Sequence, residues 1–168
     1  MTVASTNDRT DPLPVFPNTG KARALRVLRE AWRDAAETTA AHQWRRFFEM
    51  GYVRKNLSAN QDVAAPALCT AKQRIGAQRL QMVRYQVVGT LQSFLSNRQN
   101  DFRQIVERSS LDGETKHQLH SINKRQAWFD RRDVVTKNGT VVPGSTQKLA
   151  RRIMRHVLTQ HRRPSFKN

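Results

Sequence analysis

The longest regular pattern in the sequence runs from residue 66 to residue 108, where apolar side chains recur at helical spacing. Recurrence every three or four residues is typical of an amphipathic helix, whereas a half-buried strand alternates strictly. The apolar face is made by Leu80, Val83, Val87, Leu91, Phe94, Leu95, Phe102, Ile105 and Val106. This stretch predicts a fold built mainly from helices.

Features within this stretch predict where the helix begins and where it is weakest. Pro66 suits the first turn, because the N–H that proline lacks would have no helical partner there. Gly76 and Gly89 each cost about 1 kcal/mol against alanine in a helix, so they predict close packing or a bend. Ser96-Asn97 is a further candidate break.

Residues 20–50 show the same helical spacing, with Thr19 as the expected N-cap and Gly51 just beyond the last turn. The segment 52–65 is rich in Asn, Ser and Asp, which favour turns, and predicts a connection. The polar, proline-containing segment 1–19 predicts a flexible tail. The stripe of the first helix consists of Leu25, Leu28, Trp32, Ala35, Ala36, Thr39 and Phe47.

Two further helices are expected in the C-terminal third. One covers 110–133 and is capped by Ser110 or Asp112, and the other covers about 146–162 and is capped by Ser145.

A short β-hairpin is expected near 134–142, because Asn138-Gly139 lies between two pairs of β-branched residues. The fold class is therefore mostly α: a bundle of four to five helices with this hairpin and a disordered N-terminal tail. We expect the segment 20–168 to form a single helical nucleic-acid-binding domain.

The charge of the chain indicates its partner. Thirty Lys and Arg residues against thirteen Asp and Glu residues give a formal net charge of +17. Nucleic acid is the usual polyanion for such a chain, because neutralising its phosphates releases condensed counterions. An acidic protein is the lesser alternative. The basic residues gather where no acidic residue intervenes, in 66–98 and in 145–168.

The candidate phosphate contacts follow from this distribution. The C-terminal helix and the residues after it carry the main set, with no carboxylate to balance it, whereas exposed faces usually mix signs. Trp44 is the candidate for stacking on a base. The candidate binding residues are Lys148, Arg151, Arg152, Arg155, Arg162 and Arg163, supported by Arg79, Arg84, Arg45 and Arg46.

The residues that carry metal, redox or hydrolytic chemistry are sparse. Cys69 is the single cysteine, and His117 and His120 share a helix without a third ligand at metal spacing. The carboxylates are scattered, unlike those of a two-metal nuclease. We therefore expect no cofactor, no metal and no catalytic residue in this chain. We also expect a cytoplasmic protein without a membrane partner, since no apolar run approaches the length of a membrane span.

Four segments resemble the N-terminal recognition region of TnpB-type (OrfB family) transposases. They are Leu80–Val106, Leu119–Phe129, Lys148–Leu158 and His161–Pro164. The resemblance implies the helical recognition portion of an RNA-guided DNA nuclease of an insertion sequence, which contacts guide RNA and the guide–target duplex. In that family a RuvC-like domain cuts with divalent metal, and no position here matches its catalytic residues. The resemblance thus implies a chain truncated before the nuclease domain and inactive alone.

The sequence therefore supports two hypotheses of different classes. The first is a nucleic-acid-binding portion of a transposase-like nuclease, with guide RNA, DNA or both as partners. The alternative is a helical interaction module that docks on an acidic protein. A self-contained enzyme is the weakest option, and the oligomeric state stays open.

Overall fold

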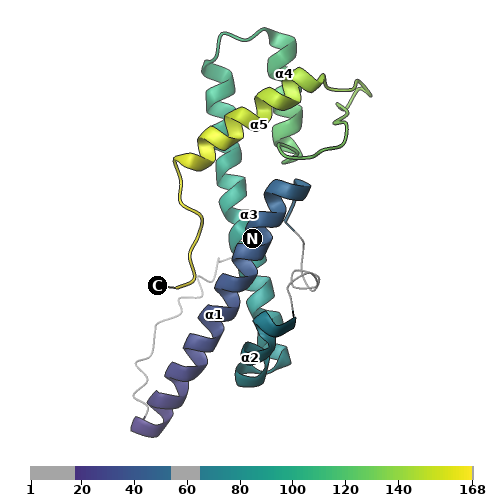
Figure 1. Ribbon diagram of the computed structural model, residues 1–168. Helices are drawn as coiled ribbons and strands as arrows, with labels where there is room; N and C mark the ends of the chain where they lie inside the picture. The colour runs from purple at the N-terminus through teal and green to yellow at the C-terminus, as the bar shows by residue number, and fades with distance from the viewer. Residues whose placement is uncertain (1–17, 54–64, 168) are drawn as a thin grey trace, which may run out of the picture.

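The computed structural model describes residues 18–53 and 65–167, and the described chain is mostly helical (Figure 1). This confirms the expected fold class, with five helices. The expected tail and most of the connection 52–65 lie outside the described residues. The helices are α1 Thr19–Met50, α2 Ala65–Ile75, α3 Ala77–Arg108, α4 Gly113–Lys124 and α5 Gly144–Thr159.

The helix α3 is shared by two small helical layers (Figure 1). Helices α1 and α2 pack on each other and on α3, and α4 and α5 do the same at its other end. The Trp32 indole N–H donates to Gln86 Oε1 at 3.0 Å, which places α1 against the N-terminal half of α3. Of the five described helices, α1 and α5 do not pack directly against each other.

Both ends of α1 have identifiable caps. The N-cap is Asn18 and not the expected Thr19, since the Asn18 side-chain oxygen accepts from the Lys21 N–H at 2.9 Å. At the other end Gly51 adopts a φ of 83°, and its N–H donates to the Phe47 carbonyl at 3.0 Å, as expected for a glycine after the last turn.

The expected single helix 66–108 is divided at Gly76, which has a φ of 81° and a ψ of 161°. Few residues other than glycine adopt this conformation, so the chain breaks here and α2 turns back beside α3. The helix continues without interruption through Ser96-Asn97, so the candidate break there is wrong. Nothing lies within 4 Å of a Cβ added at Gly89, so Gly89 does not mark the close packing that was one of its two expected roles.

The helix expected over 110–133 begins as predicted, with Asp112 Oδ1 accepting from the Thr115 N–H at 2.9 Å, but it ends at Lys124. A tight turn follows in which Gln126 has a φ of 55°. This turn brings Trp128 back under the helix, where its indole N–H donates to Asn123 Oδ1 at 3.0 Å. Tertiary contacts therefore end the helix nine residues early.

The expected hairpin is reduced to a single antiparallel bridge between Val135 and Val141, and the described residues contain no longer strand. Helix α5 then begins at Gly144 after Pro143 as N-cap, so the expected cap at Ser145 is wrong. It ends at Thr159, and the residues after it run as an extended segment.

Aromatic rings fill the junction between the two layers. The buried Phe47 ring lies 5.1 Å from Phe129 and 6.3 Å from Trp128, centroid to centroid. Trp44 lies 5.8 Å from the Phe94 ring of α3. This aromatic cluster joins the end of α1 to α3 and to the turn after α4, and it sets the position of the site described next.

Candidate nucleic-acid interface

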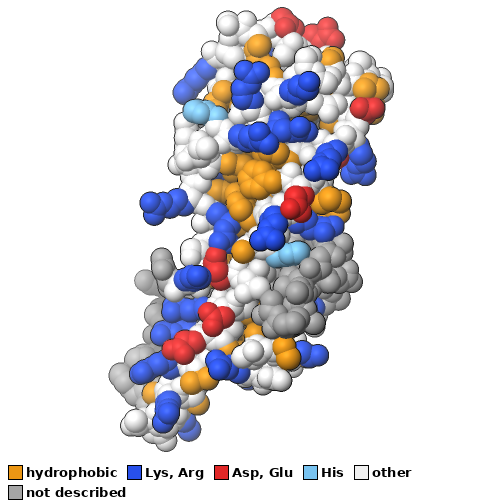
Figure 2. All heavy atoms as spheres, viewed as in Figure 1, with side chains coloured by type: hydrophobic (Ala, Val, Ile, Leu, Met, Phe, Trp, Pro, Cys, Tyr) orange, Lys and Arg blue, Asp and Glu red, His pale blue; other side chains and the backbone are white. Residues whose placement is uncertain are grey.

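The outer face of α5 is a row of cations. Thr146, Ala150, Met154 and Val157 are buried and mark the inner face of the helix. At 100° per residue, Lys148, Arg152 and Arg155 project from the opposite side, and all three are exposed. The helix contains no Asp or Glu. Figure 2 shows Lys and Arg side chains gathered across this part of the molecule.

Two of the predicted phosphate contacts are engaged within the protein. Arg151 is half-buried, and its guanidinium donates to the Asp130 carbonyl at 3.3 Å. Arg163 forms an ion pair with Glu37 of α1, with both side chains partly buried. These two residues bind other parts of the chain, whereas Arg162 is exposed.

Glu37 anchors the C-terminal segment. Its Oε1 accepts from the Arg163 guanidinium, and its Oε2 accepts from the Phe166 N–H at 3.1 Å. Burial raises the pKa of Glu37, but the hydrogen bonds from Arg163 and Phe166 and the nearby positive charge outweigh it, so this pKa lies below its usual value. The segment 160–167 thus crosses from α5 to the side of α1.

Between α1 and the C-terminal end of α5 lies an open groove of about 370 Å³, which we call the α1–α5 groove. The backbones of these two helices do not approach each other closely. Figure 2 shows hydrophobic side chains gathered in the middle of this face, with Lys and Arg side chains around them. The groove is lined by Trp44, Phe48, Arg155, Leu158, Thr159, His161 and Arg163.

The supporting cations of the prediction are dispersed. Arg45 is exposed on α1, while Arg46 donates to the Tyr52 hydroxyl at 3.2 Å and lies over its ring at 5.5 Å. Arg79 is exposed near the start of α3, and Arg84 is half-buried. Asp101 of α3 contacts His161, just after the end of α5, and so marks where α5 ends beside α3. Arg79 lies 22 positions before Asp101, which is about 33 Å along the axis of α3. The N-terminal part of α3 is therefore a separate basic surface.

The sequence named Trp44 as the candidate for base stacking and gave no sign of Phe48 beside it. Trp44 is half-buried, with rings packed around it from Phe47, Phe48 and Phe94. Phe48 is 38% exposed and faces the groove. No local signal separates these two neighbours, because which ring stays open depends on where α5 lies.

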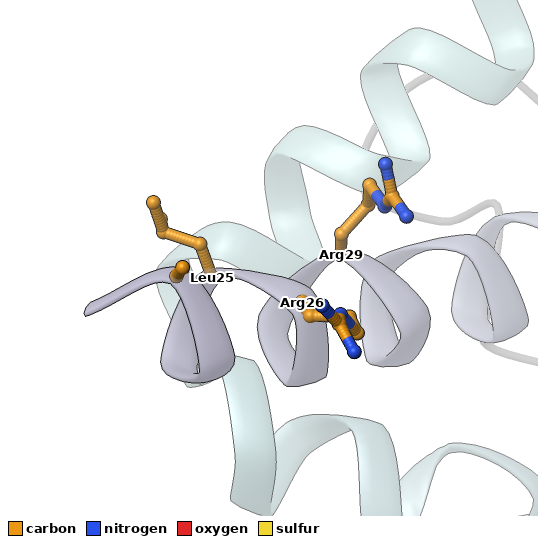
Figure 3. Close-up of a pocket in the computed structure, with 4 residues that line it drawn as sticks. Leu25, Arg26 and Arg29 are labelled. Atoms are coloured by element: carbon orange, nitrogen blue, oxygen red, sulfur yellow. The ribbon is translucent and has the colours of Figure 1, made fainter. Parts of the chain in front are cut away.

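A second hollow lies on the first turns of α1, with a volume of about 310 Å³ (Figure 3). Ala22, Leu25, Arg26 and Arg29 line it, and Leu25 is 53% exposed. Figure 3 shows the three longer side chains projecting from the one helix. All four lining residues belong to α1, so no second described element faces them across the hollow. This hollow is therefore a weaker candidate than the α1–α5 groove.

The two histidines at helical spacing have different surroundings. His120 Nε2 lies 3.1 Å from Glu107 Oε1, while His117 is exposed. Across residues 18–53 and 65–167, no group of three potential metal-ligating side chains comes together. In the same ranges, no helix is both long and apolar enough to span a bilayer.

Comparison with protein-family models, with curated proteins and with solved structures found no match to this chain. The resemblance to TnpB-type transposases therefore stays a prediction that depends on the four sequence segments alone.

Proposed function

We propose that the chain binds nucleic acid through the outer face of α5. The observation that carries this proposal is the row Lys148, Arg152 and Arg155, which projects opposite the buried face of a helix without a single carboxylate. The free protein bears the repulsion within this row, and phosphates would remove it.

The spacing of the row suits a phosphate backbone. The three residues rise along α5 by about 6 Å and then about 4.5 Å, at roughly 1.5 Å per residue. Contacts of this kind position a protein on nucleic acid without reading its sequence. Arg162 extends the exposed positive surface beyond the helix, and the net charge of +17 adds long-range attraction.

The test is a salt titration of duplex binding with the triple variant Lys148→Gln, Arg152→Gln and Arg155→Gln. Each phosphate contact contributes about 0.9 to the slope of log K against log salt, so the slope should fall by about 2.7. The matched control replaces three other exposed cations, Arg103, Arg108 and Lys124, and removes the same net charge.

The control variant separates a defined surface from diffuse attraction. A slope that falls equally in both triple variants would contradict a site on α5. An affinity that does not change with salt, or equally tight capture of polyglutamate, would favour the alternative of an acidic protein partner.

The four TnpB-like segments support a narrower form of the proposal, in which the chain is the recognition portion of an RNA-guided nuclease. Such portions bind a guide–target hybrid through its A-form backbone. An RNA–DNA hybrid should then compete more strongly than a DNA duplex of the same sequence. Equal competition would contradict the narrower form and leave general nucleic-acid binding intact.

A further inference from the structure

The α1–α5 groove combines an apolar floor with a basic rim. Trp44, Phe48 and Leu158 supply the apolar surface, and the rim is formed by the guanidinium groups of Arg155 and Arg163 and the imidazole of His161. A ligand that fills it needs a flat apolar part and an anionic part. Nucleotides have both, since every base has a π-face and every phosphate a negative charge.

The Phe48 ring is held in a fixed orientation. It makes edge-type contacts with Trp44 at 5.4 Å, with Phe47 at 5.4 Å and with Phe129 at 4.9 Å. These three neighbours restrict the ring while 38% of the residue remains exposed. A ligand that stacks there would therefore find a preorganised surface, and little side-chain entropy would be lost on binding.

The three side chains of the rim differ in how they are paired. Arg163 is held by Glu37, and His161 Nε2 lies 3.4 Å from Asp101 Oδ2. Arg155 is exposed, and it has no hydrogen bond or ion pair with any residue that the structure describes. Arg155 also belongs to the outer row of α5, so it links the groove to the proposed phosphate-binding surface.

We propose that the α1–α5 groove binds one unpaired nucleotide, with the base against Phe48 and Leu158 and the adjoining phosphate on Arg155. This inference depends on the proposed function and extends it to a class of substrate, nucleic acid with an unpaired end. A volume of about 370 Å³ is at the small end of ligand sites, which suits one nucleotide. A base inside a duplex is stacked on both sides and cannot enter.

The experiment compares the full chain on a blunt DNA duplex and on the same duplex with a short oligothymidine overhang, at one fixed salt concentration. Stacking on an aromatic side chain contributes about 1–3 kcal/mol per base, so the overhang should tighten binding roughly 5- to 150-fold. The variant Phe48→Leu keeps an apolar side chain and removes the aromatic face. It should lose most of this gain and bind the blunt duplex as the wild type does.

Two further variants sharpen the result. Phe48→Trp should keep or increase the gain, while Met50→Ala, at a neighbouring position that is 47% exposed, should leave it unchanged. An overhang gain that persists in Phe48→Leu would overturn the groove proposal and leave binding by α5 intact. A second outcome would also overturn the groove proposal. If the triple variant at Lys148, Arg152 and Arg155 bound the blunt duplex more weakly but kept the overhang gain, Arg155 would have no role in the groove. If the wild type binds neither duplex, the proposed function itself fails.

Discussion

Glu37 and Arg163 form an ion pair across 126 positions of the sequence, and this pair ties the C-terminal segment to the middle of α1. Both residues are partly buried, and the same carboxylate also accepts the backbone N–H of Phe166 at 3.1 Å. One side chain therefore fixes one wall of the α1–α5 groove.

Glu37→Gln should release this segment, because an amide cannot balance the Arg163 charge and presents only one acceptor oxygen in place of two. We expect faster tryptic cleavage after Arg162, measured by mass spectrometry, with little change in helix content; the bond after Arg163 resists trypsin because Pro164 follows it. Glu30→Gln, at an exposed position on the same helix, is the control. Equal cleavage rates in both variants would show that the ion pair does not hold the segment.

The same contact should make stability depend on pH. The pKa of Glu37 is lowered in the folded chain, so the contact stabilises the fold above its unfolded value of about 4.5 and is lost as the pH falls through the folded value. Denaturation of wild type and Glu37→Gln should therefore differ at pH 7, and the difference should shrink below pH 4.5. A difference that grows on acidification would contradict this assignment.

Gly51→Ala should destabilise the fold by about 2–4 kcal/mol. Gly51 has a φ of 83°, and an added Cβ would lie 2.7 Å from the backbone nitrogen of Asp130, which cannot move without disturbing the aromatic cluster. Gly89→Ala is the matched control, since nothing lies within 4 Å of its added Cβ inside α3. It should stabilise by about 0.5–1 kcal/mol. Chemical denaturation measures both, and equal midpoints would contradict the close approach.

Asn123→Ala should cost about 2 kcal/mol or more, because buried partners would lose their hydrogen bonds. The Asn123 amide donates to the Gln99 carbonyl at 2.9 Å and accepts from the Trp128 indole at 3.0 Å. The exposed Asn97, on α3, supplies the control substitution. Thermal unfolding should separate the two variants by several degrees, and overlapping curves would show that this network is dispensable.

Local patterns in the sequence predicted the helices well and their ends less well. The apolar stripe of α3 and the cap at Asp112 follow from spacing and side-chain chemistry alone. The end of α4 does not, because it depends on Asn123 meeting Gln99 and Trp128, residues that only the folded chain brings together. Gly76 marked a weak point of the expected helix, but the spacing of apolar residues around it could not show that the chain reverses direction there.

The candidate site was predicted in part. The exposed row on α5 is where the charge distribution placed it, because an amphipathic helix fixes which residues face outward. Arg151 and Arg163 were expected beside it as phosphate contacts, but each binds a partner distant in sequence, Asp130 or Glu37. The α1–α5 groove could not be predicted, since its lining comes from two helices that only the folded chain brings to one place.

The length of α3 gives a scale for a duplex that lies along the molecule. Its 32 residues span about 48 Å, which equals roughly 14 base pairs of duplex. A duplex of that length carries about 28 phosphate charges, against +17 on the chain. A one-to-one complex with a duplex of that length would therefore keep a net negative charge. Because precipitation is promoted by charge neutralisation, the complex should stay in solution while the duplex is saturated.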